Sequence, residues 1–208
     1  MDSLEQVQVG VYPEYPAISP LYLWERVRVR GDDQSRGDMA GEGLEDILAD
    51  DLSVIFCGIN PGLKAAAQGH HFAGRSNRFW RTLHLAGFTP QEIRAEDDRS
   101  ILHHRCGLTA VVGRPTARAD QLALHEFNAV AASFEAKIER CAPRFVAFLG
   151  KAAYAALSGQ KQVPWGRQAE LFGGCPVWVL PNPSGRNLAF TQGDLVEAYQ
   201  ALFLAIEA

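Results

Sequence analysis

Cysteine is scarce in this sequence of 208 residues, and its spacing excludes several kinds of site. The four copies are Cys57, Cys106, Cys141 and Cys175. No C-x-x-C pair occurs, so neither a zinc site nor a redox dithiol is predicted, and reduced core thiols are expected. The sequence also lacks a P-loop and a G-x-G-x-x-G fingerprint, which leaves a nucleotide cofactor without support. We therefore expect neither a cofactor nor a metal.

Long hydrophobic runs are missing as well. No apolar stretch approaches the ~20 residues that span a bilayer, and the acidic start Met1–Gln6 lacks the basic end and apolar centre of a signal peptide. Hydrophobic residues nevertheless make up 47% of the chain, which is enough for one sizeable core. We expect a soluble cytoplasmic protein that has no membrane partner and is a monomer.

Positive charge is in deficit overall, because the formal net charge is −4. A surface that binds DNA must neutralise phosphates with Lys and Arg, so this total argues against nucleic acid. The charge is unevenly divided, however. Residues 1–50 carry 11 acidic and 4 basic side chains, a net −7, and residues 51–208 carry the remaining 13 and 16, a net +3. The larger part of the chain is mildly basic.

The N-terminal fifth of the chain differs in composition from the rest. Gly31–Gly43 is rich in glycine and acidic residues with almost nothing to bury, and is interpreted as a flexible linker. Ahead of it, Leu21–Arg30 alternates Val with Arg, a pattern that fits a half-buried edge strand or a basic arm. We divide the chain into an acidic N-terminal extension, residues 1–43, and one main domain, residues 44–208.

Short apolar runs alternate with longer helical patterns from residue 52 onward. This alternation predicts an α/β fold, a three-layer α/β/α sandwich around a mainly parallel sheet. Nearly continuous apolar runs are typical of strands buried on both faces. The predicted strands are Leu52–Cys57, Phe145–Leu149, Val177–Leu180 and, with a weaker pattern, Leu108–Val112.

Helices are predicted from apolar residues at i, i+3 and i+4. One starts at Ser76 or Asn77 and ends at Leu85, and Lys151–Leu157 forms another. The last, Asp194–Ile206, has a start at Thr191 that resembles a capping box. A long helix that ends before Pro143 carries on one face Phe127, Val130, Phe134 and Ile138.

Two predicted strands end in the same kind of polar turn. Leu52–Cys57 is followed by Gly58-Ile59-Asn60-Pro61-Gly62, and Val177–Leu180 by Pro181-Asn182-Pro183-Ser184-Gly185. Ligands of open α/β sheets bind outside the carboxyl ends of the strands. Asn, Pro and Gly also make ordinary turns, but two such turns at the same edge favour a binding site.

An aromatic residue stands between these two turns in the sequence. Phe72 precedes Gly74 in a predicted loop, where its ring could stack on a planar base. Phe79 and Trp80 fall on the following helix and are expected in the core.

The charged residues around Phe72 are interpreted mainly as surface. His70 and His71 are expected to be solvated loop residues, because no Cys, Asp or Glu accompanies them at metal-ligand spacing. Eight arginines occur from Arg75 to Arg118, and a few on one face would suffice for phosphate contacts.

Several motifs together resemble one family, the mismatch-specific uracil-DNA glycosylases of the bacterial MUG and thymine-DNA glycosylase group. The resemblance covers about residues 44–208, and residues 1–43 lie outside it. The motifs that carry it are Gly58-Ile59-Asn60-Pro61-Gly62, the stretch from Phe72 to Trp80, Arg105-Cys106-Gly107, Arg114-Pro115-Thr116, Trp165-Gly166 and Asn182-Pro183-Ser184-Gly185.

The resemblance implies hydrolysis of the bond between deoxyribose and a uracil flipped out of mismatched duplex DNA, mainly opposite guanine. Phe72 matches the residue that stacks on the base, and Asn60 the residue that positions the attacking water. Main-chain N–H groups near Ile59 and Phe72 match the donors to uracil oxygens. The pocket is completed by Gly62, Ala65 and Asn182. The loop inserted into the duplex, and hence the expected DNA contacts, is Ser184, Gly185, Arg186 and Asn187.

An amide at the catalytic position sets the expected chemistry. Asn60 cannot take up a proton near neutral pH, so it should orient water rather than act as a general base. The wider superfamily typically has Asp and His where this chain has Asn60 and Asn182, so weaker chemistry and a flat pH–rate profile are expected. Asp97 and Asp98, otherwise interpreted as solvated loop acids, are the first candidates if a carboxylate assists.

Other departures bear on specificity. Arg186 and Asn187 stand where relatives often have Leu and, two residues later, Arg. Arg186 is expected to fill the gap in the duplex and Asn187 to hydrogen-bond the opposite base. Ala65 replaces a Ser of some relatives, and the extra room predicts a substrate range wider than uracil.

Three alternatives remain open at this point. One is a four-cysteine, iron–sulfur uracil-DNA glycosylase, against which the wide cysteine spacing argues. Another is a non-catalytic protein that binds mismatched or damaged DNA. The third is an α/β enzyme acting on free nucleosides, which would not require duplex DNA.

Overall fold

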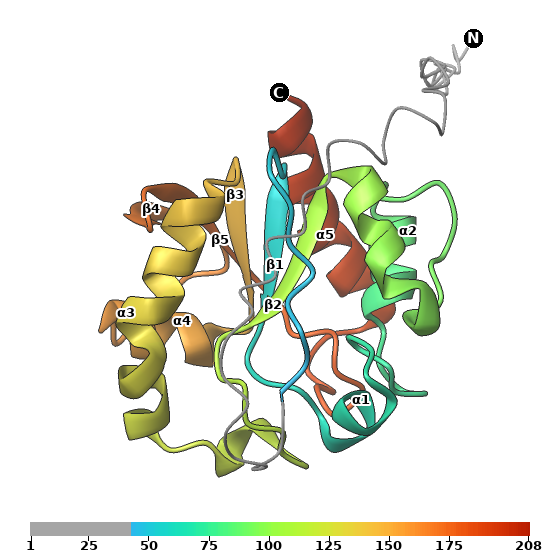
Figure 1. Cartoon of the computed structure of the whole chain (residues 1–208). Coiled ribbons are helices and arrows are strands. Elements are labelled where there is room, and N and C mark those ends of the chain that lie inside the picture. The colour runs from blue at the N-terminus through green and yellow to red at the C-terminus, as the bar shows by residue number, and fades with distance from the viewer. Residues whose placement is uncertain (1–42) are drawn as a thin grey trace, which may run out of the picture.

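The computed structural model describes residues 43–208, which form a five-stranded sheet between two layers of helices (Figure 1). The strands are β1 (Val54–Gly58), β2 (Cys106–Ala110), β3 (Phe145–Leu149), β4 (Gly166–Phe172) and β5 (Cys175–Leu180). Their order is β2-β1-β3-β5-β4, and all neighbours are parallel except the antiparallel pair β4 and β5. The predicted α/β/α fold with a mainly parallel sheet is confirmed.

The helices cover both faces of the sheet, and the two groups lie on opposite sides of it in Figure 1. On one side are α2 (Phe79–Leu85) and α5 (Gln192–Glu207), and on the other are α3 (Leu124–Cys141) and α4 (Lys151–Ser158). Three further elements are α1 (Leu63–Gln68) and the 3₁₀ segments η2 (Ala95–His104) and η3 (Ala119–Gln121).

Each face of the sheet has its own aromatic core, because β1 and β3 are buried on both faces. On the α2/α5 side, Phe56 of β1 packs edge-on against Phe79 and stacks with Tyr199. On the α3/α4 side, Phe148 of β3 packs against Phe134 and Tyr154. Burial of these large side chains on both faces fixes the sheet, and with it the loops at the carboxyl ends of its strands.

The C-terminal helix begins as its sequence predicts. Thr191 is the N-cap of α5, and its hydroxyl accepts a hydrogen bond from the Asp194 N–H. The Asp194 carboxylate in turn accepts from the Thr191 N–H at 2.7 Å, and this bond lowers the pKa of Asp194. The predicted capping box is confirmed, with Asp in the place usually taken by Glu or Gln.

Several boundaries differ from the prediction. The strand expected at Leu108–Val112 begins earlier, at Cys106, and ends at Ala110. Neither α1 nor η2 was predicted from the sequence, nor was the edge strand β4, four of whose seven residues are exposed. Gly43 alone of the N-terminal extension, residues 1–43, belongs to the described residues. The strand or arm at Leu21–Arg30 lies outside them.

The four cysteines are unpaired and lie on β1, β2, α3 and β5. Cys57, Cys106 and Cys175 are buried, whereas Cys141 at the end of α3 is half-buried. Burial raises the pKa of the Cys106 thiol to about 12, so this thiol stays protonated at neutral pH. Among residues 43–208, no three His, Cys, Asp or Glu side chains gather as a metal site would require.

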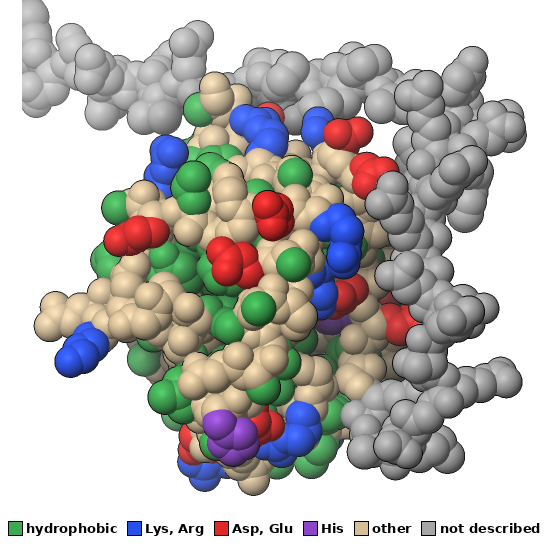
Figure 2. Space-filling model, turned by 60° about the vertical axis from the view of Figure 1, so that its left-hand side comes forward, with side chains coloured by type: hydrophobic (Ala, Val, Ile, Leu, Met, Phe, Trp, Pro, Cys, Tyr) green, Lys and Arg blue, Asp and Glu red, His purple; other side chains and the backbone are tan. Residues whose placement is uncertain are grey.

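Cationic and acidic side chains are interspersed on the face of the molecule shown in Figure 2. That face carries no broad surface of a single sign, and hydrophobic side chains are scattered between the charges. Within the described part of the chain, no helix has both the length and the hydropathy needed to cross a bilayer.

Candidate active site

The candidate site is a cavity of about 530 Å³ at the carboxyl ends of β1, β3 and β5. The loop after β1, the loop that holds Phe72, the loop after β2 and the loop after β5 all contribute to it. Nine of the ten residues predicted from the sequence line this cavity, and Asn187 is the exception. They are Ile59, Asn60, Gly62, Ala65, Phe72, Asn182, Ser184, Gly185 and Arg186.

The side chain of Asn60 has a single orientation. Its Nδ2 donates to the main-chain oxygen of Arg114 at 2.8 Å and to the hydroxyl oxygen of Thr116 at 2.7 Å. The Thr116 hydroxyl donates its own proton to the Arg118 carbonyl oxygen at 2.8 Å, so toward Asn60 it acts only as an acceptor. Both amide hydrogens are thus used, and Oδ1 makes no hydrogen bond among the described residues. This oxygen is free to accept a hydrogen bond from a water molecule.

Main-chain pairing joins the loops after β1 and β2 and holds Asn60 in place. The Thr116 N–H donates to the Pro61 carbonyl oxygen at 3.1 Å, and the Leu63 N–H donates to the Thr116 carbonyl oxygen at 3.2 Å. Thr116 is buried. The segment that carries both acceptors of Asn60 is therefore held to the loop after β1 by backbone hydrogen bonds.

Phe72 separates this cavity from a second cavity next to it, and it lines both of them. It has a left-handed backbone with φ of 57°, which is uncommon for a residue other than glycine. Its half-buried ring stacks on Phe79 with centroids 3.9 Å apart, and a Cβ added at Gly58 would lie 3.8 Å from it. The core placement predicted for Phe79 and Trp80 is confirmed, since both are buried. Phe79 therefore supports the Phe72 ring from behind.

Asn182 organises the loop after β5. Its Nδ2 donates to the Leu149 carbonyl oxygen at 3.1 Å, and its Oδ1 accepts from the Ser184 N–H at 2.9 Å. One amide hydrogen remains for a ligand. The Asn182 carbonyl oxygen accepts from Nδ2 of Asn187 at 2.9 Å, so that nitrogen is engaged within the loop.

Comparison with known proteins identifies the family to which the chain belongs. The family described as the Uracil DNA glycosylase superfamily matches residues 45–203. The chain belongs to this superfamily. Membership implies a DNA N-glycosylase, a hydrolase that removes uracil from DNA.

A solved structure agrees with the superfamily fold. It is the solution NMR structure of a candidate uracil DNA glycosylase from Methanosarcina acetivorans. The TM-score is 0.58 and the sequence identity 23%, and the match covers 81% of this chain and 99% of that one. At this identity the likeness shows the fold alone, an α/β sheet of the uracil-DNA glycosylase kind.

The histidines before Phe72 depart from the solvated placement expected for them. His71 is buried, and its Nε2 lies 2.9 Å from the Glu45 carbonyl oxygen. Burial lowers the pKa of His71. His70 is half-buried, with Nδ1 3.5 Å from a carboxylate oxygen of Asp98. The expectation of solvated histidines was therefore wrong for His71.

Asp98 also differs from its expected placement as a solvated loop acid. Asp97 is exposed as predicted for a loop acid, but Asp98 is buried. The Asp98 carboxylate accepts a hydrogen bond from the His71 N–H at 2.8 Å, and the His71 carbonyl oxygen accepts from the indole of Trp80 at 3.2 Å. These two bonds hold the backbone just ahead of Phe72, so Asp98 supports the wall of the cavity.

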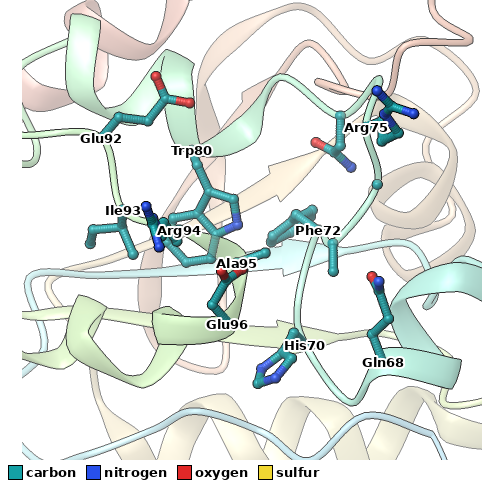
Figure 3. A pocket seen from close by; sticks show the side chains of 13 residues that line it. Gln68, His70, Phe72, Arg75, Trp80, Glu92, Ile93, Arg94, Ala95 and Glu96 are labelled. Atoms are coloured by element: carbon teal, nitrogen blue, oxygen red, sulfur yellow. The ribbon is translucent and has the colours of Figure 1, made fainter.

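A second cavity of about 760 Å³ lies beyond Phe72 (Figure 3). Phe72 and Trp80 face it, with the segment from Glu92 to Glu96 on one side and Gln68 and His70 on the other. It is the larger of the two, but neither Asn60 nor Asn182 lines it. The smaller cavity, where the strand ends converge, is therefore the candidate for the glycosylase site.

Basic side chains surround the mouth of the smaller cavity. Lys64, Arg75, Arg118 and Arg186 line it, and Arg118 forms an ion pair with Asp120. Beside the same edge, Lys151 follows β3 and places its Nζ 4.4 Å from the ring centroid of Trp165. Sequence reasoning gave no role to Lys151, to Thr116 or to the half-buried Arg78, because their partners are distant in the chain.

Proposed function

We propose that this protein is a mismatch-specific uracil-DNA glycosylase, which flips uracil from a G:U pair and hydrolyses its N-glycosidic bond to leave an abasic site. The observation that carries the proposal is the unpartnered Oδ1 of Asn60 in a cavity walled by Phe72. Membership in the uracil DNA glycosylase superfamily supports the reaction class.

The cavity suits a flipped pyrimidine. A base that leaves the duplex loses stacking and pairing worth a few kcal/mol, and a mismatched base loses least. Phe72 offers a ring on which the base stacks, and Ile59 and Phe72, whose main-chain N–H groups are the proposed donors, both line the same space. Donors aimed at uracil oxygens stabilise the negative charge that develops on the departing base.

Asn60 prepares the attacking water. Its Oδ1 accepts one hydrogen of a water molecule and holds the water oxygen toward C1′ of the deoxyribose. The new C1′–O bond forms as the C1′–N1 bond breaks, and the electron pair of that bond leaves with uracil N1. The water proton passes to solvent, because an amide cannot hold it near neutral pH.

The loop after Asn182 enters the duplex in this account. Arg186 and Leu188 project from it, and Leu188 is 90% exposed. Arg186 fills the space that the flipped nucleotide vacates. Asn187 donates one hydrogen of Nδ2 to the Asn182 carbonyl oxygen, which leaves its amide oxygen and a second N–H free. The free amide oxygen suits guanine, which offers N1–H and N2–H donors to it.

Room beside the base extends the proposed substrate range. Ala65 is buried and lines the cavity without a hydroxyl. A methyl or other group at position 5 of the pyrimidine takes that space. The same site therefore accepts thymine and other modified pyrimidines opposite guanine, more slowly than uracil.

Excision from defined duplexes tests the proposal. Uracil opposite guanine, uracil opposite adenine, thymine opposite guanine and free deoxyuridine are compared in single turnovers, with abasic sites revealed by alkali. We expect the fastest release from the G:U duplex and none from the free nucleoside. Release from the nucleoside, or an intact G:U duplex, would overturn the proposal.

A further inference from the structure

We propose that Arg78 is a positioning residue, which holds the loop after β5 in the conformation that enters DNA. The inference rests on the proposed function and adds a residue to it. Arg78 lies immediately before α2 and lines neither cavity. Its side chain instead extends toward residues more than 100 positions away in the chain.

The Arg78 guanidinium binds three main-chain oxygens of this loop. Nη1 donates to the Phe190 carbonyl oxygen at 2.7 Å, and Nη2 donates to those of Asn187 at 2.9 Å and Ser184 at 3.2 Å. A planar guanidinium with five N–H donors can serve three acceptors at once, which a lysine ammonium on its flexible stem does not match. The contacts span both ends of the segment 184–190.

A second contact fixes the loop against the same stretch of chain. The Arg78 N–H donates to the Pro183 carbonyl oxygen at 3.0 Å. Gly185 packs so closely on Ser76 that an added Cβ would lie 2.4 Å from the Ser76 carbonyl oxygen. The loop after β5 is thus joined to residues 76–78 through backbone contacts as well as through the guanidinium.

These contacts connect the two parts of the proposed site. Residues 76–78 follow directly on the Phe72 loop, whereas Arg186 and Leu188 belong to the loop that Arg78 holds. Arg78 therefore sets the distance between the smaller cavity, where the flipped base is proposed to bind, and the side chain of Arg186, which fills the vacated space. A loop ordered in advance avoids the entropy cost of ordering when it enters the duplex.

The expected effect is selective, because Arg78 touches the loop rather than the reacting atoms. Affinity for a duplex with an abasic site opposite guanine requires the inserted loop. Affinity for undamaged duplex depends mainly on phosphate contacts, which the loop conformation hardly alters. Loss of Arg78 should therefore lower the first affinity and leave the second nearly unchanged.

The test uses the full chain with Arg78→Met and Arg78→Lys. The control is Arg81→Met, since Arg81 is exposed on α2 and forms no hydrogen bond or ion pair within residues 43–208. Hydrogen exchange of peptides covering 184–190, thermal unfolding, and Kd for abasic and undamaged duplexes are measured on each. The concentration of enzyme that gives half-maximal uracil excision is measured separately from the maximal rate.

We expect Arg78→Met to speed exchange in the loop and to lower affinity for the abasic duplex at least ~tenfold, with less than about a twofold change for undamaged DNA. Arg78→Lys should give a smaller loss in the same ratio, and it serves as the test if the Met variant does not fold. Both variants should raise the half-maximal enzyme concentration more than they lower the maximal rate. Arg81→Met should match the wild type.

Two results would overturn the inference. One is loop exchange that Arg78→Met leaves unchanged, and the other is an equal loss of affinity for both duplexes. A wild-type protein that neither excises uracil nor prefers the abasic duplex would instead overturn the proposed function, and the insertion role with it. Hydrogen exchange, which needs no DNA, distinguishes the two failures.

Discussion

The side-chain nitrogen of Asn60 donates a hydrogen bond to the Thr116 hydroxyl oxygen across 2.7 Å. The two residues are 56 positions apart and meet because the loops after β1 and β2 pair with each other. This bond, with the one to the Arg114 carbonyl oxygen, turns Oδ1 of Asn60 away from the protein's own donors. Thr116 thereby decides which end of the amide is presented to water.

Substitution of Thr116 tests that relationship. Thr116→Val removes one of the two acceptors, so the Asn60 amide keeps only its bond to the Arg114 carbonyl oxygen and holds the water less firmly. We expect single-turnover uracil excision to slow ~tenfold, the worth of one well-placed hydrogen bond, with DNA affinity unchanged. Thr116→Ser keeps the hydroxyl and should retain nearly the wild-type rate. Equal rates for the Ser and Val variants would contradict the role of the hydroxyl.

Burial of His71 predicts a pH dependence of stability. Desolvation lowers its pKa below the ordinary value of 6.5, so below that pH the unfolded chain binds the proton more readily than the folded one. Stability should be fully present above about pH 6.5 and decline as the pH falls through the lowered pKa of His71. His71→Gln keeps a donor for the Glu45 carbonyl oxygen but does not titrate.

Urea unfolding between about pH 5 and pH 8 measures this contribution. The free energy of unfolding of the Gln variant should fall less steeply below pH 6.5 than that of the wild type. Part of the slope should remain, because burial also lowers the pKa of His104. Identical slopes for variant and wild type would show that His71 does not cause the decline.

Ala65 gives a prediction about substrate range. Ala65→Ser places a hydroxyl in the space proposed for a substituent at position 5 of the pyrimidine. Excision of thymine opposite guanine should fall at least ~fivefold relative to uracil opposite guanine, a loss on the scale of one crowded methyl group. The matched control is Ala67→Ser, an exposed position of the same helix. An unchanged ratio of thymine to uracil excision would remove Ala65 as a determinant.

Lys151 is predicted to contact a DNA phosphate. Its Nζ lies over the ring of Trp165, which is 43% exposed, at the sheet edge that holds the base cavity. Lys151→Met should lower the slope of log affinity against log salt concentration by about 0.9, the value for one phosphate contact. Arg144→Met is the control, because Arg144 is exposed at the opposite end of β3. Equal slopes for the two variants would exclude the contact.

The sequence predicted the parts of the fold that depend on hydrophobic pattern. Phe145–Leu149 is a continuous apolar run and is a strand with those bounds. The edge strand Gly166–Phe172 was missed because it has no continuous apolar run, since Arg167, Gln168 and Glu170 interrupt its apolar residues. The helix α1 was missed for a different reason. It has only six residues, which is too short for the spacing of apolar residues to indicate a helix.

The candidate site was predictable as far as strand ends and turn residues could indicate it. Asn60 and Asn182 line one cavity as expected for two polar turns at the same edge of a sheet. The acceptors that bind Arg78 and the partner of His71 Nε2 are main-chain oxygens, which no residue type reveals. Burial of Asp98 likewise follows from a bond to the His71 N–H, a contact that only the folded chain creates.

In the proposed reaction, Asn60 positions the water that attacks the flipped nucleotide. The most direct test measures excision from a G:U duplex by the wild type and by Asn60→Ala, together with Kd for the same duplex under conditions without turnover. We predict that the variant loses at least ~100-fold in single-turnover rate, because the water is no longer oriented, while its Kd stays within about threefold. Excision by Asn60→Ala at the wild-type rate would contradict the account.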